Sequence, residues 1–315
     1  MRLLRTPSVI GARRFAIPAF LSIAAILPLA LGISAVPAQK KPPSPAAQAS
    51  AVAPAPSLTR TTSRHEVRRF GYGGALTVYG APQGAISIEG WSKSEIDITA
   101  DIELRADTED DLTRLAAVNN FLFDAEPNHI RIVSTGTHDR KYMKRVARDF
   151  PKKLLTLPWK IDYRIRVPVA IDLEIYAGRG ALTLSGVEGA IRINGGGERS
   201  APSLLLLMGG DVKAIVERGP LNVRIASRSW RGRGAEVRLA SGDLTVELPA
   251  NLNAELDVEV LRAGRIENSY PALIARDERL PATERLQRLR AGSGGAPLSF
   301  IVGDGTLRIK QEGSK

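Results

Sequence analysis

The sequence predicts a repetitive all-β fold, because a glycine-headed unit recurs along the chain, sometimes after only nine residues. Each unit is a glycine, a small or turn residue, and four residues that alternate aliphatic and polar. This alternation buries one face of a strand and leaves the other in water. Glycine supplies the backbone angles that turns between strands need. The units are residues 74–79, 84–89, 180–185, 189–194, 219–224, 242–247 and 305–310.

The N-terminal segment, residues 1–38, is predicted to be a signal peptide. Four arginines precede an uncharged apolar run over residues 15–38, and small residues around Ala38 suit cleavage after it. The apolar run is also long enough to span a bilayer, so an uncleaved N-terminal membrane anchor is the alternative. Either way the body is expected to be exported, to the periplasm, the outer surface or the medium.

Residues 39–65 are rich in Pro, Ala and Ser and are predicted to form a disordered tether. The β-repeat domain is then expected over residues 66–315. Besides the glycine-headed units, period-two alternation predicts strands at residues 66–70, 95–105, 128–134, 161–167, 170–176 and 298–302.

One packed helix is predicted near residues 108–122. Thr108 can cap it, three acidic residues follow in its first turn, and apolar residues recur at helical spacing. Two insertions interrupt the strands. Residues 138–160 are charged and predict a long loop with a helical turn over residues 140–148, and residues 276–295 include a short amphipathic helical segment at 283–290.

The positive charge of the chain is local. The formal net charge is +11, and removing the four arginines of residues 1–38 leaves 40 basic and 33 acidic residues, about +7. Residues 138–166 alone contain ten Lys/Arg and three Asp, which is also +7. The rest of the exported body is therefore close to neutral, and a charge-dependent partner would bind at one place.

The composition argues against most catalytic and metal chemistry. The chain has no cysteine, which excludes thiolate nucleophiles and zinc–thiolate sites. Its three histidines share no ligand spacing. The Gly-Asp turns at Asp211, Asp243 and Asp304 lack the regular repeat of calcium-binding β-rolls. We therefore predict no catalytic residue, no metal and no cofactor.

Three strand–turn segments resemble a known family. Residues 167–186, with Gly-Arg-Gly-Ala-Leu-Thr-Leu-Ser-Gly at their end, residues 240–249 and residues 302–309 carry the pattern. Together they resemble the bacterial "putative adhesin" domain of unknown function, a family of Gly-Asp strand repeats. The resemblance covers roughly residues 66–312 and implies a right-handed β-solenoid-like or β-prism-like ladder in an exported protein. It brings no catalytic residue with it.

The basic insertion is the candidate binding site. Aromatic residues lie between its cations, and an exported protein meets lipid headgroups and acidic polymers as polyanions. A solvated loop with apolar anchors is the structural alternative. The predicted anion-binding patch is Lys141, Lys144, Arg145, Arg148, Lys152 and Lys153.

These observations favour a non-enzymatic, exported cell-envelope protein that acts as an adhesin or surface-interaction module. Its predicted partners are an anionic polymer or lipid headgroups, bound through residues 138–160, without specific nucleic-acid readout. One alternative is a β-helical hydrolase that acts on envelope polysaccharide. Another is a structural or sensory module that binds a second envelope protein.

Overall fold

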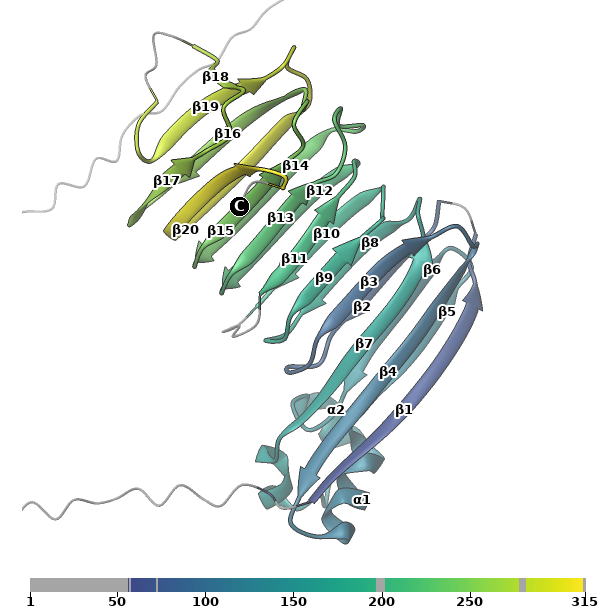
Figure 1. Cartoon of the computed structure of the whole chain (residues 1–315). Helices are drawn as coiled ribbons and strands as arrows, with labels where there is room; N and C mark the ends of the chain where they lie inside the picture. The colour runs from purple at the N-terminus through teal and green to yellow at the C-terminus, as the bar shows by residue number, and fades with distance from the viewer. Residues whose placement is uncertain (1–55, 57, 72, 197–201, 278–281, 314–315) are drawn as a thin grey trace, which may run out of the picture. The chain divides into compact units, whose positions relative to one another are not determined.

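The computed structural model describes residues 56, 58–71, 73–196, 202–277 and 282–313. The predicted signal peptide and nearly all of the predicted tether before Leu58 lie outside these residues. The described part is mostly β and forms a large sheet that is not closed (Figure 1). Within it no helix has the length and apolar character needed to cross a membrane.

The strands form two ladders, here named sheet A and sheet B. Sheet A has the order β1 (Leu58–Arg69), β4 (Glu95–Ala106), β7 (Trp159–Pro168), β3 (Ile86–Trp91), β9 (Leu182–Ser185), β11 (Ser203–Leu207), β13 (Leu221–Ile225), β15 (Leu244–Leu248), the C-terminal half of β20 (Pro297–Gln311) and β17 (Gly264–Asn268). Sheet B has the order β5 (Asn120–Glu126), β6 (His129–Thr135), β2 (Ala75–Tyr79), β8 (Asp172–Ala177), β10 (Ala190–Gly195), β12 (Asp211–Arg218), β14 (Gly234–Ser241), the N-terminal half of β20, β16 (Ala254–Val260), β19 (Leu286–Ala291) and β18 (Leu273–Ala275).

From β8 to β15, successive strands of the chain alternate between the two sheets. Each strand from β8 to β13 pairs in parallel with the strand two further along the chain, and β14 and β15 both pair in parallel with β20. Antiparallel pairs occur among the described strands only near the ends of the two ladders. The inward aliphatic residues of both sheets form one hydrophobic core. The all-β prediction is confirmed, whereas the solenoid or prism class and its right hand remain predictions.

Glycines stack on one another where the repeated units begin. Gly242 and Gly305 have φ angles of +136° and +141°. A Cβ on Gly305 would lie 1.9 Å from the carbonyl oxygen of Gly242, and a Cβ on Gly242 would lie 2.4 Å from that of Gly219. Glycine is therefore required for both the backbone angle and the space between turns. This explains why the repeated unit begins with glycine.

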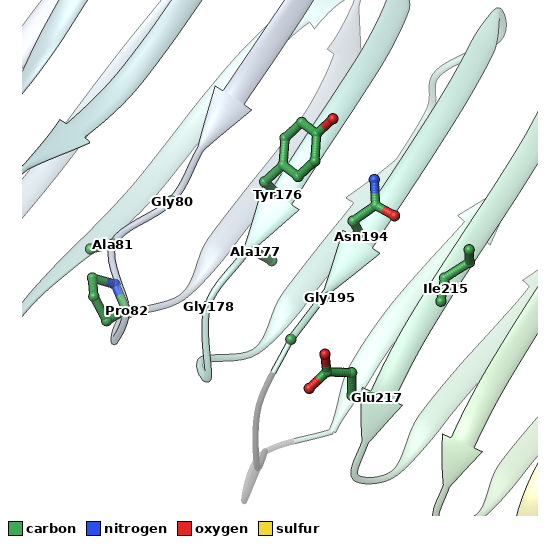
Figure 2. Close-up of a pocket in the computed structure, with 11 residues that line it drawn as sticks. Gly80, Ala81, Pro82, Tyr176, Ala177, Gly178, Asn194, Gly195, Ile215 and Glu217 are labelled. Carbon is green, nitrogen blue, oxygen red and sulfur yellow. The ribbon is translucent and has the colours of Figure 1, made fainter. Parts of the chain in front are cut away.

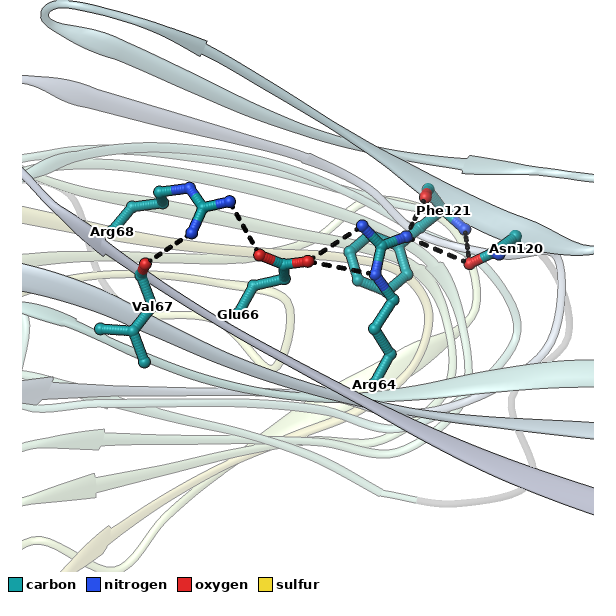
Figure 3. A network of polar contacts seen from close by, with 6 residues as sticks. All are labelled: Arg64, Glu66, Val67, Arg68, Asn120 and Phe121. Atoms are coloured by element: carbon teal, nitrogen blue, oxygen red, sulfur yellow. Dashed lines mark hydrogen bonds and ion pairs between the residues drawn. The ribbon is translucent and has the colours of Figure 1, made fainter.

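At the N-terminal ends of the ladders, Arg64 joins the two sheets (Figure 3). From β1 its guanidinium donates to the backbone carbonyl of Phe121 in β5 at 3.0 Å and lies 4.3 Å from the centre of that phenyl ring. Glu66 accepts from Arg64 at 3.1 Å and pairs with Arg68 at 2.9 Å. The hydrogen bond from Arg64 holds the pKa of Glu66 below its ordinary value.

Strand β1 begins at Leu58, eight residues before the expected start of the β domain at residue 66. Leu58–Arg69 pairs over its whole length with β4, so residues 58–65 belong to the body and not to the tether. The polar composition of residues 58–65 did not indicate a strand, because β1 is an edge strand and most of its side chains are exposed.

Two predicted helical segments differ in the structure. Helix α1 (Glu109–Val118) begins after Thr108, whose hydroxyl accepts from the amide of Asp111 at 3.1 Å, as expected. It ends before the predicted limit of residue 122, because β5 pairs with β6 there and buries Phe121. Residues 286–290, predicted within a helix, belong to β19, because the edge of β16 accepts them as an antiparallel strand. Strand pairing overrode local helical spacing in both segments.

The glycine stack can be tested with Gly305→Ala. We expect a loss of about 2–4 kcal/mol of folding free energy, because the new methyl group would overlap a backbone carbonyl that cannot rotate away. Urea unfolding followed by circular dichroism measures this loss. Gly73→Ala is the matched control, since Gly73 also has a positive φ, +74°, but no atom lies within 4 Å of the place that a Cβ would take there. Equal losses in the two variants would show that only the backbone angle matters.

Candidate anion-binding surface

The residues between β6 and β7 form a helical insert, defined here as residues 138–158. Its first part is α2 (Arg140–Val146), and a 3-10 turn, η1 (Lys152–Thr156), follows Pro151. Asp139 caps α2, because its carboxylate accepts from the amides of Lys141 and Tyr142 at 2.9 and 3.0 Å. The bond from the Tyr142 amide makes the largest contribution to lowering the pKa of Asp139. The expected helical turn is therefore present and properly capped.

Buried side chains fasten the insert to the β body. Met143 and Leu154 are buried beneath it, together with Trp159 at the start of β7. The Trp159 indole donates to the Thr137 hydroxyl at 3.0 Å, and the Thr137 amide donates to the Asn119 side chain at 2.9 Å. The insert is thus held in one position next to the end of α1.

A hollow of about 360 Å³ lies on the surface of the insert. Thr137 lies at its edge. The apolar lining residues are Met143, Ala147, Phe150 and Leu155, and the cationic lining residues are Arg140, Lys144, Arg148 and Lys152. We name these four cations the basic patch. Arg140 and Lys144 are four residues apart in α2, the spacing that places side chains on one side of a helix, and Arg148 follows the end of the helix at Val146.

The structure divides the six predicted patch residues into three groups. Lys144, Arg148 and Lys152 line the hollow. Lys141 and Arg145 are exposed on α2 but do not line it. Lys153 instead pairs with Asp111 of α1 at 3.0 Å.

Sequence reasoning missed Arg140 and the apolar floor of the hollow. The four-residue spacing from Arg140 through Lys144 to Arg148 could have indicated the former. The floor could not be found this way, because Phe150 and Leu155 reach it from outside α2.

The charge of the insert is not neutralised locally. The insert contains seven Lys/Arg and two Asp. Among the residues that the structure describes, none of the four patch cations has an ion-pair partner, whereas many arginines on the sheets are paired. The ring of His138 packs 5.3 Å from that of Trp159, and the loss of water there lowers the pKa of His138. At pH 7 the positive charge of the hollow therefore comes from Lys and Arg.

The three Gly-Asp turns hold arginines. Asp211 binds Arg192 at 2.8 Å, Asp243 binds Arg308 at 3.0 Å, and Asp304 binds Arg262 in a close ion pair. Over the described ranges, no group of three or more His, Asp or Glu side chains is placed to hold a metal ion. These aspartates therefore act in ion pairs that join neighbouring strands and turns.

No family model matches this chain, and no curated protein matches its sequence. Among solved structures, it is similar to a "putative cell adhesion protein" from Clostridium sporogenes, at 11% identity over 80% of this chain and 100% of that chain, with a TM-score of 0.42. It is also similar to a "putative adhesin" from Bacteroides fragilis, at 12% identity over 79% and 97%, with a TM-score of 0.30. A third is a "putative lipid binding protein" from Parabacteroides distasonis, at 13% identity over 79% and 96%, with a TM-score of 0.28. Similarities at this sequence identity and TM-score say nothing about ligands. The ligands of this chain are therefore argued from its own surface.

The contact of the insert with α1 can be tested with Lys153→Met. The hydrogen bond from Lys153 is the main reason that the pKa of Asp111 lies below its ordinary value. We therefore expect this pKa to rise in the variant, as measured by carboxyl-carbon NMR during an acid titration. Asp111 contributes stability above its unfolded-state pKa and loses it as pH falls through its folded-state pKa.

The variant should accordingly be less stable than the native protein at neutral pH, and the difference should shrink on acidification toward about pH 2. Lys152→Met is the control, because Lys152 is an exposed neighbour with no ion pair among the described residues. An Asp111 pKa that changes equally in both variants would contradict the assigned contact.

Proposed function

We propose that this chain is a non-enzymatic, exported cell-envelope protein that binds anionic lipid surfaces through its helical insert. The observation that carries the proposal is the basic patch around an apolar floor. Cations near an anionic bilayer each contribute about 1 kcal/mol of attraction. Apolar side chains next to them can enter the headgroup region and add to binding.

Exposed aliphatic residues favour a lipid surface over a soluble polyanion. Val146 is 50% exposed and Leu155 is 39% exposed, and both belong to the helical insert. A dissolved anionic polymer would be attracted by the cations alone and would gain little from these side chains. A bilayer interface uses both kinds of group.

The place where the chain enters the β body is consistent with a helical insert that faces a membrane. Leu58, the first residue of β1, pairs with Ala106, the last residue of β4, which lies three residues before the start of α1. Lys153 connects α1 to the insert, so β1 starts at the same end of the body as the insert (Figure 1). Residues 15–38, the predicted export segment, precede this point in sequence. The end of the body that follows the export segment first in the chain is therefore the end that carries the basic patch.

The proposal can be tested by converting the four patch cations, Arg140, Lys144, Arg148 and Lys152, to Gln in the full chain. Binding to vesicles of phosphatidylcholine with phosphatidylglycerol is measured by sedimentation, and pure phosphatidylcholine vesicles show any insertion of the N-terminal segment. Four cations at about 1 kcal/mol each predict that anionic vesicle binding falls by about 100-fold or more.

A matched control replaces four exposed cations outside the insert, Arg69, Arg179, Arg218 and Arg228, with Gln. This control has the same net charge as the patch variant. Binding that falls equally in both variants would mean that only total charge matters, and unchanged binding in the patch variant would refute the site. Val146→Ser with Leu155→Ser should also weaken binding, with the charge unchanged.

A further inference from the structure

A second surface lies on the outward face of sheet B, away from the helical insert. It contains three adjoining hollows of about 390, 440 and 390 Å³. The tyrosine hollow includes Tyr176, Asn194, Ile215 and Glu217, the cationic hollow includes Arg192, Lys213, Arg233 and Arg238, and the leucine hollow includes Ile215, Arg238, Leu261 and Ile301. The leucine hollow shares Ile215 and Glu217 with the tyrosine hollow, and Arg238 and Ile301 with the cationic hollow. Through it the three hollows form one track over β8, β10, β12, β14, β20 and β16.

The tyrosine hollow offers an aromatic surface. Tyr79 and Tyr176 are opposite each other in β2 and β8, and their rings stack 4.7 Å apart with only 4° between their planes. Both rings are exposed, at 39% and 36%. The neighbour of Tyr176 on its other side is Asn194, whose short side chain ends the stack (Figure 2). One face of Tyr176 is therefore directed toward the hollow, where a flat ring could continue the stack.

The cationic hollow has an excess of positive charge. Arg192 pairs with Asp211 at 2.8 Å, and Arg238 forms a close pair with Glu236. Lys213 and Arg233 are exposed and have no ion-pair partner among the described residues. Their charges are available for an anionic group on a ligand.

The track also provides acceptors for hydroxyl groups. Asn194 and Glu217 lie in the tyrosine hollow, and Glu259 lies in the leucine hollow. A polyanion without hydroxyls would be repelled by these carboxylates, whereas a sugar can donate hydrogen bonds to them. The combination of ring face, hydroxyl acceptors and unpaired cations fits an acidic sugar better than phosphate alone.

The repeat distance of the track suits a polymer. Neighbouring strands lie about 4.8 Å apart, so Lys213 in β12 is displaced about 10 Å, and Arg233 next to β14 about 14 Å, across the strands from Tyr176 in β8. One sugar unit of an extended chain advances by a length similar to that strand spacing. We propose that the outward face of sheet B binds one extended acidic polysaccharide, with a sugar ring on Tyr176 and carboxylates at Lys213 and Arg233.

Calorimetry tests this proposal. The full chain is titrated with hexagalacturonate at low salt, and the titration is repeated with cellohexaose and with inorganic polyphosphate. Tyr176→Ala should weaken hexagalacturonate binding about fivefold to tenfold through loss of stacking. Lys213→Gln with Arg233→Gln should weaken it about fivefold or more through loss of the two charges. Arg69→Gln with Arg228→Gln, the matched control outside the track, should leave it unchanged.

Asn194→Tyr tests the proposed stacking place by adding a ring instead of removing one. Its ring would extend the stack of Tyr79 and Tyr176, so folding should persist while the place for a sugar ring is filled. Hexagalacturonate binding should fall about tenfold. Circular dichroism confirms that each variant is folded.

Several results would overturn the proposal. One is hexagalacturonate binding that survives both Tyr176→Ala and Asn194→Tyr. Another is polyphosphate binding of equal strength with the same dependence on Lys213 and Arg233, which would show a general polyanion site. Substitutions in the basic patch should leave the dependence of hexagalacturonate binding on Tyr176 unchanged, so the failure of this inference and that of the lipid-binding proposal can be told apart.

Discussion

Direct stacking of one backbone turn on the next is the constraint on which the rest of the structure depends. Gly219, Gly242 and Gly305 bring neighbouring turns so close that a methyl group on the second or third would overlap a carbonyl oxygen. This close approach keeps the strands in register, and register decides which side chains enter the core. Because each buried row continues into the next strand, the two sheets share one core without a disulfide.

The same register arranges the outward side chains in rows, and the rows give the two sheets different surfaces. On sheet A, Arg224 meets Glu247, and Glu247 in turn binds Lys310, so charges largely cancel. On sheet B, Tyr79 and Tyr176 stack while Lys213 and Arg233 stay without ion partners among the described residues. The outward rows of sheet A therefore carry ion-paired charges, whereas those of sheet B also include an aromatic stack and cations without ion partners among the described residues.

The helical insert is not part of the strand ladders, and it carries a third kind of surface. Its buried residues, Met143 and Leu154, fix it to the body, while the four cations of the basic patch are exposed. The proposed lipid site and the proposed polysaccharide track would then let one protein connect a membrane to an acidic polymer.

The sequence by itself determined the all-β class, most strands, the start of α1 and the location of the basic insertion, because these depend on neighbouring residues through period-two alternation, capping and charge. Only the tertiary structure decided that residues 58–65 and 286–290 are strands, since an edge strand is defined by its partner. It also decided that Lys153 is tied to Asp111 of α1. That contact joins residues far apart in the chain, so local patterns carry no information about it.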